Sequence, residues 1–438
     1  MTLNDILLIT GGTLLCGDRN TIIDNFTIDS NDIKENNLFL AINRGNEYYL
    51  DALKNGSKAV IIDNPKVVKK LDKNIILVNN TIKAMEMLAK KKLLSSKASV
   101  IGITGSVGKT TTKDIIYSVL KEKYKVLKTK ENYNGKIGVP YTILNLKDED
   151  ILVLEMGIDD INGFTEFSKY VKLDLALITN IGYSHIEKFE SRENILEAKL
   201  KIINCLKNNG ILLLNNNDEL LDKVKLNNVN TLKYGKNVYK TSDVRIDDKL
   251  NFKINNLELS VPYTGTSYIN NYLVSYIIGK YYGMSDYLIK EGIENAHLSS
   301  DRMNIERYNN ITFIQDYYNA SYESVKNALE VLSNFKTRKI AVLGDILELG
   351  RYSKIIHENI GYEVIKNKIN KLVTVGDNSL NIARIVKENS NIDTYSLSDI
   401  DEALSLLLCL LNDNDTILLK ASHKMNFKTL TKNLKNNL

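Results

Sequence analysis

The chain has 438 residues, 43% of them hydrophobic and 25% charged, which is the composition of an ordinary folded protein and excludes collagen-like and disordered classes. The 58 basic and 53 acidic residues leave a net charge of +5, too small over this length to indicate a nucleic-acid partner. At roughly 150 residues per domain, the length predicts about three domains.

The cysteines, the N-terminal residues and the apolar stretches indicate where in the cell the protein is expected. Cys16, Cys205 and Cys409 include no CxxC pair and indicate neither a disulfide framework nor a zinc site. The N-terminus lacks the basic start and apolar core of a signal peptide. No apolar run approaches the roughly 18 residues that a membrane helix needs. We therefore expect a cytoplasmic protein that neither spans a membrane nor binds nucleic acid, and we expect a monomer.

Short β-branched runs alternate with amphipathic helical stretches, which predicts an α/β fold with parallel sheets. A first region, residues 1–97, has strand candidates at 37–42, 59–62 and 75–78 and closes in a polar linker at 90–97. A second, 98–298, has strands at 99–104, 151–154, 175–179 and 211–214 and a helix at 271–282. A third, 299–438, has strands at 312–315, 339–343, 371–375 and 416–419. Its alternation with helices is typical of a doubly wound, Rossmann-like domain.

A phosphate loop is predicted at residues 100–112, VIGITGSVGKTTT, where a strand turns into a helix. Gly105 and Gly108 would let backbone N–H groups close on phosphate oxygens, and Lys109 would neutralise them. Thr110 can ligate Mg²⁺.

A carboxylate at the end of a neighbouring strand is the usual partner of such a loop. Glu155 follows the strand at 151–154. A hard cation prefers an oxygen ligand of this kind. The residue is either a metal ligand or a solvated carboxylate at a strand end.

A lysine lies on the apolar face of the next predicted helix, which Ser191 should cap. At 100° per residue, Lys199 falls in the middle of the stripe formed by Ile195, Leu196, Ile202, Ile203 and Leu206. Such a lysine must snorkel, pair with an anion or lose its charge. A neutral amine can react with CO₂ to form a carbamate, which is an anionic metal ligand. His185, before this helix, is either structural or a ligand.

These residues carry a resemblance to the Mur ligases, the ATP-dependent amide ligases of peptidoglycan precursor synthesis. The matching segments are 102–112, 132–140, 155–157, 179–187, 198–199, 316–320 and 341–350. The last of them, AVLGDILELG, favours the branch that adds D-Ala-D-Ala to a UDP-N-acetylmuramoyl tripeptide.

The resemblance implies an N-terminal nucleotide-sugar domain (1–97), a central P-loop ATPase (98–298) and a C-terminal Rossmann-like ligase domain (299–438) that closes over ATP. It implies catalytic roles for Lys109, Glu155, His185 and Lys199. Two Mg²⁺ ions are implied, the first on Thr110 and Glu155 and the second on His185 and the carbamate of Lys199 with CO₂. The implied ATP contacts are Gly105, Ser106, Val107, Gly108, Lys109, Thr110, Thr111, Asn271, Arg302, Asp316 and Asn319. The implied substrate contacts are Asp29, Ser30, Asn132, Asn134, Lys420 and Ser422.

The implied reaction is ADP-forming amide ligation through an acyl phosphate, with a UDP-N-acetylmuramoyl peptide and D-Ala-D-Ala as small-molecule partners. The chain departs from the family at Asn31 and His423, where the family carries arginine. Two alternatives therefore stay open. One is a Mur-family ligase with another carboxylate and amine, and the other is a nucleotide-binding relative without catalysis.

Overall fold

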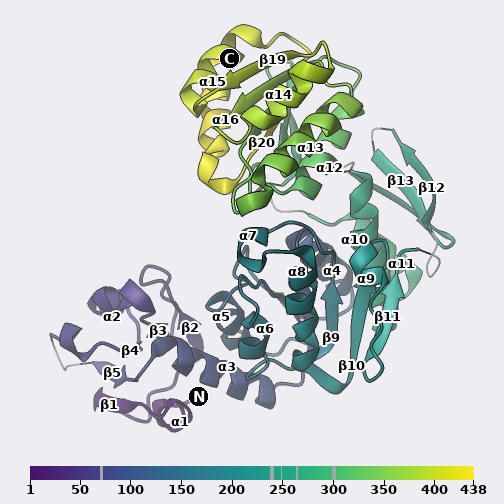
Figure 1. The fold of residues 1–438 in the computed structure, drawn as a ribbon. Helices are drawn as coiled ribbons and strands as arrows, with labels where there is room; N and C mark the ends of the chain where they lie inside the picture. The colour runs from purple at the N-terminus through teal and green to yellow at the C-terminus, as the bar shows by residue number, and fades with distance from the viewer. Residues whose placement is uncertain (70–72, 237–240, 248, 263–264, 298–301) are drawn as a thin grey trace.

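The computed structural model describes residues 1–69, 73–236, 241–247, 249–262, 265–297 and 302–438. Three α/β regions follow one another in chain order, with the middle region between the other two (Figure 1). The α/β fold class predicted from the alternating pattern is confirmed. The predicted boundary at 298/299 lies outside the described residues.

The N-terminal region is a five-stranded sheet in the order β1-β5-β4-β3-β2, in which only the β1/β5 pair is antiparallel. Its strands are β1 (Thr13–Cys16), β2 (Asn25–Thr27), β3 (Asn37–Leu40), β4 (Ala59–Ile62) and β5 (Asn74–Leu77), and its helices are α1 (Leu3–Thr10), α2 (Tyr49–Lys54) and α3 (Thr81–Ser95).

The predicted polar linker at 90–97 is wrong, because most of it is the end of α3. Asn80 caps this helix by accepting a hydrogen bond from the backbone N–H of Lys83 at 2.8 Å. Leu88 and Ala89 are buried, whereas Lys90 and Lys91 are exposed and Lys92 is half-buried. The run of lysines is therefore the solvated face of an amphipathic helix, which contacts α5 (Gly138–Leu144) of the middle region.

The middle region is a six-stranded parallel sheet in the order β11-β10-β9-β6-β8-β7. Its strands are β6 (Ser99–Thr104), β7 (Val126–Lys128), β8 (Ile151–Glu155), β9 (Leu173–Ile178), β10 (Leu206–Asn215) and β11 (Asn230–Tyr234). Its first helices are α4 (Lys109–Leu120), α6 (Gly163–Phe167), α7 (Ile186–Phe189), α8 (Arg192–Leu200) and α9 (Glu219–Asp222). Because β6 pairs with both β8 and β9, the residues that follow these three strands meet at one sheet edge.

A small antiparallel sheet and two helices complete this region: β12 (Thr241–Ile246), β13 (Lys249–Ile254), β14 (Leu257–Pro262), α10 (Ile269–Tyr281) and α11 (Asp286–Glu294). Both helices pack against α4. The α11 contact needs a glycine, since a Cβ on Gly292 would lie 2.4 Å from the Val119 Cα.

The C-terminal region is a six-stranded sheet in the order β15-β16-β20-β17-β18-β19, parallel except for the β15/β16 pair. Helices α12 to α14 cover one face and α15 and α16 the other. The elements are β15 (Asn304–Tyr308), β16 (Ile311–Gln315), α12 (Tyr322–Ser333), β17 (Lys339–Gly344), α13 (Ser353–Lys366), β18 (Lys371–Val375), α14 (Leu380–Asn389), β19 (Asp393–Leu397), α15 (Ile400–Leu410), β20 (Thr416–Lys420) and α16 (Phe427–Asn437).

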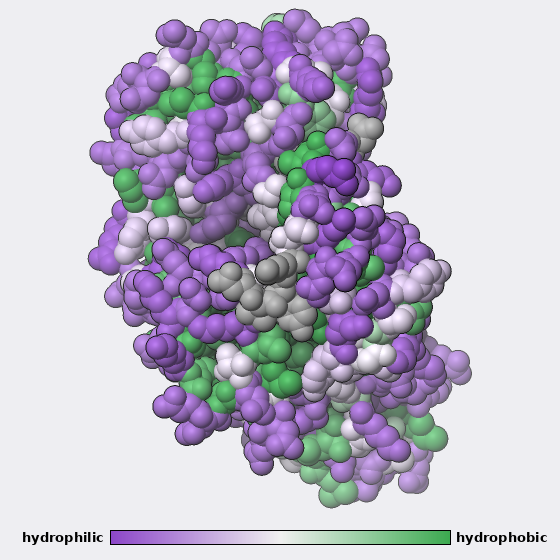
Figure 2. Space-filling model, turned by 90° about the vertical axis from the view of Figure 1, so that its right-hand side faces the viewer, coloured by the Kyte–Doolittle hydropathy of each residue, from purple (hydrophilic) through white to green (hydrophobic). Residues whose placement is uncertain are grey.

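The predicted strands all occur, with ends displaced by a few residues. Hydrophilic side chains cover most of the molecular face that includes the middle and C-terminal regions (Figure 2). Across the described ranges, no helix has both the length and the hydropathy needed to cross a bilayer.

Candidate active site

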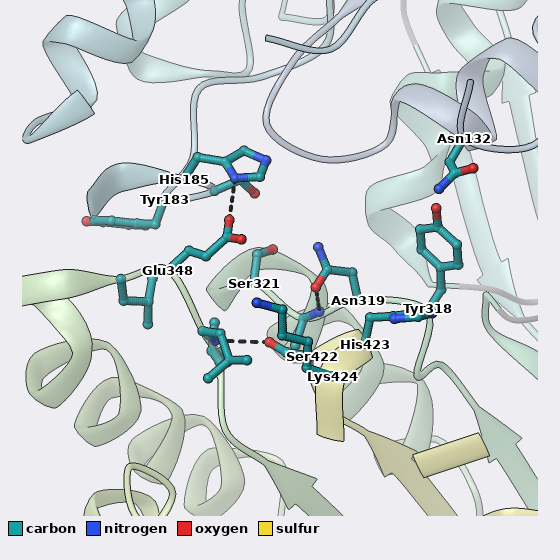
Figure 3. Close-up of a pocket in the computed structure, with 15 residues that line it drawn as sticks. Asn132, Tyr183, His185, Tyr318, Asn319, Ser321, Glu348, Ser422, His423 and Lys424 are labelled. Carbon is teal, nitrogen blue, oxygen red and sulfur yellow. Dashed lines mark hydrogen bonds and ion pairs between the residues drawn. The ribbon is translucent and has the colours of Figure 1, made fainter. Parts of the chain in front are cut away.

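A cavity of about 480 Å³ lies between the middle and C-terminal regions. The phosphate loop forms part of its wall, and residues 302 and 316–327 of the C-terminal region form another part. A smaller cavity of about 290 Å³ adjoins it and shares several lining residues with it, His185 and Asn319 among them (Figure 3). The predicted residues that line the larger cavity are Ser106, Val107, Gly108, Lys109, Thr110, Thr111, Asn132, Asn134, Glu155, His185, Asn271, Arg302, Asp316, Asn319 and Lys420.

The predicted phosphate loop joins β6 to α4, as its sequence indicates. Gly105 has φ +149° and Gly108 has φ +79°, both in the region that favours glycine. A Cβ on Gly105 would lie 1.9 Å from the Thr179 Oγ1, so no other residue fits there. The N-terminal turn of α4 then presents free backbone N–H groups toward the cavity, as phosphate binding requires.

Two residues after β9 hold this loop in place, and the sequence alone did not identify them as its anchors. Thr179 donates its hydroxyl to the Val107 carbonyl at 2.7 Å. The Asn180 side chain accepts from the Val107 N–H at 3.0 Å and donates to the Val107 carbonyl at 3.0 Å. These three hydrogen bonds fasten the phosphate loop to the segment that follows β9.

Lys109 is folded back on its own loop. Its ammonium group donates to the carbonyls of Gly105 at 2.7 Å and Ser106 at 3.2 Å. Burial lowers the pKa of Lys109, and the nearby Glu155 carboxylate opposes that shift. A cation held in this way is ready to exchange loop carbonyls for phosphate oxygens.

Glu155 ends β8 and is buried at the cavity wall. Its Oε1 accepts from the Asn134 side-chain amide at 2.7 Å. Its Oε2 is buried and has no hydrogen-bond partner in the described part of the chain. An unsatisfied buried carboxylate oxygen is costly unless a cation approaches it.

A second buried lysine, which sequence reasoning missed, lies behind Glu155. Lys113 Nζ is 3.7 Å from Glu155 Oε2 and 3.6 Å from Asp114 Oδ1, and it donates to the Glu131 carbonyl at 3.1 Å. Burial is the largest influence on the pKa of Lys113 and lowers it, while the two carboxylates oppose that change. The helical period could have identified this residue, because it precedes the buried Ile116 by three positions.

Lys199 is buried on α8, as the apolar stripe predicted, and Ser191 caps this helix. The side chain of Lys199 forms no hydrogen bond or ion pair with any described residue. Burial lowers the pKa of Lys199 well below its usual value, and the charge of Lys109 lowers it further. Lys199 itself lies behind the cavity wall rather than among the lining residues. It has two properties that favour carbamate formation, a lowered amine pKa and the absence of a competing partner among the described residues.

His185 connects the two regions across the smaller cavity. Its Nδ1 pairs with the carboxylate of Glu348 from the loop after β17 (Figure 3). Burial lowers the pKa of His185, and the Glu348 charge partly offsets that effect. The pairing leaves Nε2 available for a ligand. Nothing in the local sequence around His185 points to Glu348, which is 163 residues away.

Further contacts close the C-terminal region onto the middle region around α7. The side chains of Arg351 and Tyr352 both donate to the Glu190 carbonyl, at 3.0 and 2.9 Å. The Tyr183 N–H donates to the Glu323 carboxylate at 3.2 Å. The structure is therefore a closed arrangement in which the two regions share one site.

Lys420, predicted as a substrate contact, instead holds the segment that carries Asp316 and Asn319, two of the predicted nucleotide contacts. Lys420 is buried, and its ammonium group contacts the Asp316 carboxylate at 2.7 Å and donates to the carbonyls of Asp316 and Asn319 at 3.0 and 2.9 Å. Arg302 lies over the Tyr318 ring, with 4.2 Å from its guanidinium carbon to the ring centroid. Since Lys420 uses all three donors within the protein, its geometry favours holding the 316–319 segment over contacting a ligand.

The remaining predicted substrate contacts divide between two places. Ser422 lines the smaller cavity and accepts a hydrogen bond from the Leu347 N–H at 3.0 Å. Asp29 and Ser30 lie in the N-terminal region, after β2, and line neither cavity. The Asp29 carboxylate accepts from the Asn31 N–H at 2.9 Å and shapes a turn.

Two family models match the chain. The Mur ligase middle domain matches residues 103–279, and the Mur ligase, glutamate ligase domain, matches residues 301–423. The matched segments contain the phosphate loop, Glu155, His185 and Lys199 in the first and the 316–319 segment and Glu348 in the second.

Two curated proteins are similar over nearly the whole chain. The UDP-N-acetylmuramoyl-tripeptide--D-alanyl-D-alanine ligase of Bacillus subtilis is 32% identical, over 99% of this chain and 98% of that protein. The protein of the same name from Rickettsia prowazekii is 30% identical, over 90% of this chain and 91% of its own length.

Solved structures give the same result. The crystal structure of MurF from Acinetobacter baumannii superimposes with a TM-score of 0.87 at 25% identity, over 99% of this chain and 98% of that one. The MurF ligase from Thermotoga maritima in complex with ADP superimposes with a TM-score of 0.83 at 28% identity, over 96% and 99%. Because both family models match and the similarity extends over nearly the whole chain, this chain belongs to the Mur ligase family, on the branch that contains the MurF ligases.

Proposed function

We propose that this protein joins D-Ala-D-Ala to the terminal carboxylate of a UDP-N-acetylmuramoyl tripeptide, with ATP converted to ADP and phosphate. The observation that carries the proposal is one cavity between the middle and C-terminal regions, lined by a phosphate loop and by the buried carboxylate of Glu155. The buried side chain of Lys199, which has no partner among the described residues, lies behind its wall. The similarity to ligases of this name over nearly the whole chain supports it.

The chemistry requires an activated carboxylate, because oxide is too poor a leaving group to be displaced by an amine. A carboxylate oxygen attacks the γ-phosphorus of ATP, and the bond from that phosphorus to ADP breaks. The amine nitrogen then attacks the acyl carbon and loses a proton, and phosphate departs with the former carboxylate oxygen. Both steps bring anions together and need cations between them.

The residues present fit a Mg²⁺ ion. Glu155 offers a buried carboxylate oxygen without a hydrogen bond, and Thr110 lines the same cavity. Within the described ranges, no three His, Cys, Asp or Glu side chains gather into a metal site. Further ligands would therefore come from water and from the nucleotide phosphates, as is usual for this ion. When bound, Mg²⁺ would offset phosphate charge during transfer.

A second cation would lie between His185 and a carbamate on Lys199. The buried amine of Lys199, with its lowered pKa, supports carbamate formation, and the Nε2 of His185, which Glu348 does not contact, supports metal binding. In this proposal, Lys109 binds the phosphates and the backbone N–H groups of residues 105–111 orient them. Asn271, Arg302, Asp316 and Asn319 surround the rest of the nucleotide.

The three regions would divide the substrates among them. We assign residues 1–97 to the UDP-sugar, with Asp29 and Ser30 among the contacts, residues 98–298 to ATP and residues 299–438 to the amine and to closure. Asn132 and Asn134 line the larger cavity. We also propose that the enzyme is a monomer, and ATP as co-substrate supports a cytoplasmic location.

The test is ADP release with Mg²⁺, ATP, the UDP-N-acetylmuramoyl tripeptide and D-Ala-D-Ala, together and with each omitted in turn. We expect ADP only from the complete mixture, with the pentapeptide nucleotide detected by mass spectrometry. Turnover with another carboxylate or amine would establish a different ligase, in line with the departures at Asn31 and His423. ATP binding without turnover by any pair would contradict ligation.

A further inference from the structure

The wall behind Glu155 contains two lysines and two carboxylates in contact. Lys113 lies 3.7 Å from Glu155 and 3.6 Å from Asp114, and Lys128 pairs with Asp114 at 2.6 Å. The side chains of Lys113 and Glu155 are 2% and 1% exposed, so solvent screens their interaction little. These four groups sum to zero charge without any bound ion.

The position of Glu155 is fixed from two sides. Asn134 donates to Oε1, and Lys113 lies opposite Oε2. Lys113 also donates to the carbonyl of Glu131, in the loop that carries Asn134. One ammonium group therefore positions the carboxylate and the loop that holds its other oxygen.

A divalent cation on Glu155 would meet the fixed positive charge of Lys113 at short range. Repulsion of this kind is strong at a site that is screened from water. The triphosphate of ATP brings the negative charge that offsets it, because the phosphate loop lies in the same cavity.

We propose that Lys113 makes cation binding at Glu155 conditional on the nucleotide, so that the site rejects free divalent metal and accepts it only together with phosphates. Lys113 is thus a positioning residue, acting through Glu155 rather than on a reacting atom. This inference rests on the proposed metal role of Glu155.

The test is direct binding of Mn²⁺ to the nucleotide-free full-length protein, followed by electron paramagnetic resonance. We expect weak binding by the unaltered protein and at least about tenfold tighter binding by Lys113→Met, which removes the charge and keeps the length of the side chain. Lys113→Arg should bind as weakly as the unaltered protein. Glu155→Gln, added to Lys113→Met, should abolish the gain.

A matched control and a second variant make the outcome decisive. Lys125→Met removes an exposed lysine that pairs with Asp148 and should leave Mn²⁺ affinity unchanged. Lys128→Met removes a half-buried cation and lets Asp114 draw Lys113 away from Glu155, so we expect tighter Mn²⁺ binding by a few-fold. This second variant decides the matter if Lys113→Met fails to fold in a circular dichroism melt.

Unchanged Mn²⁺ affinity in a folded Lys113→Met protein would overturn the inference. Mn²⁺ binding by the nucleotide-free, unaltered protein that is as tight as binding by Lys113→Met would also overturn the inference. Neither readout requires turnover. A failure of ligation with this Mn²⁺ pattern intact would therefore count against the proposed function alone, whereas ligation without the pattern would count against Lys113 alone.

Discussion

The two sides of the active-site cavity differ in how far their polar groups are already satisfied. On the middle-region side, Glu155 keeps an oxygen without a hydrogen bond and Lys199 keeps an amine without a partner. On the C-terminal side, the ammonium group of Lys420 contacts Asp316 and Asn319 with all of its donors, and Ser422 accepts a hydrogen bond from a backbone N–H. Polar side chains without partners can bind ligands, whereas polar side chains that already have partners hold the fold in place. This difference supports the proposal that the middle region supplies the groups for phosphoryl transfer and that the C-terminal region binds the amine and closes the site.

The largest effect should follow the loss of Lys199. Lys199→Ala should lower turnover by roughly a thousandfold, because the proposed anionic metal ligand is lost, and excess CO₂ should not restore it. The control is Lys201→Ala, which removes a neighbouring, partly exposed lysine paired with Glu197. ADP release under saturating substrates measures both. Unchanged turnover in Lys199→Ala would rule out the carbamate.

Lys420 tests the other side of the comparison. Lys420→Met should destabilise the fold by about 3–5 kcal/mol, because it leaves Asp316 buried without its cation. A thermal or urea melt measures this. If Lys420 contacts a substrate carboxylate instead, the variant will keep its stability and show a raised KM for one substrate only.

Substitution of Glu348 tests whether the contact between the middle and C-terminal regions affects catalysis. Glu348→Ala should lower kcat/KM by about 10- to 100-fold, because His185 loses the partner that orients its ring. Glu348→Gln keeps an acceptor and should recover part of the loss. The Mg²⁺ concentration for half-maximal rate should rise in the alanine variant. A lower rate with no change in Mg²⁺ dependence would assign Glu348 to closure alone.

Glu323 is the exception on the C-terminal side and carries the smallest expected effect. Its Oε2 is buried without a hydrogen bond, and burial raises the pKa of Glu323 above its usual 4.5. Because the folded state then binds the proton more tightly, stability contributed by this group is present below pH 4.5 and is lost as the pH rises through the folded pKa. Glu323→Gln should remove that loss and raise Tm at pH 8 by about 2 °C. A lower Tm for the variant at pH 8 would show that the carboxylate is stabilising there.

Much of the fold follows from local patterns in the sequence. The β-branched runs place the strands, since each predicted strand is buried and has at least one parallel neighbour, and the glycines mark the phosphate loop. The lysines at 90–92 misled the prediction because a charged helix face and a polar linker share one composition. Their distinction depends on whether Leu88 and Ala89 find a surface to pack against.

A site residue was predictable only where its role follows from residues close to it in the sequence. Lys199 could be recognised because apolar residues at helical spacing flank it, although of the predicted stripe only Ile195 and Leu196 share α8 with it. Ile202 and Ile203 lie in a 3-10 helix that follows α8, and Leu206 begins β10. The Glu348 partner of His185 could not, because the contact exists only once two regions close on each other. The sequence also could not show that all three donors of Lys420 have partners within the protein, because these contacts depend on the path of the 316–319 backbone.

The central claim is that a carboxylate is phosphorylated by ATP before the amine attacks. The most direct measurement uses a UDP-N-acetylmuramoyl tripeptide labelled with ¹⁸O in its terminal carboxylate, with ATP, Mg²⁺ and D-Ala-D-Ala. The account predicts one ¹⁸O atom in each phosphate released, because the acyl oxygen departs with phosphorus. Unlabelled phosphate formed together with the amide product would contradict it.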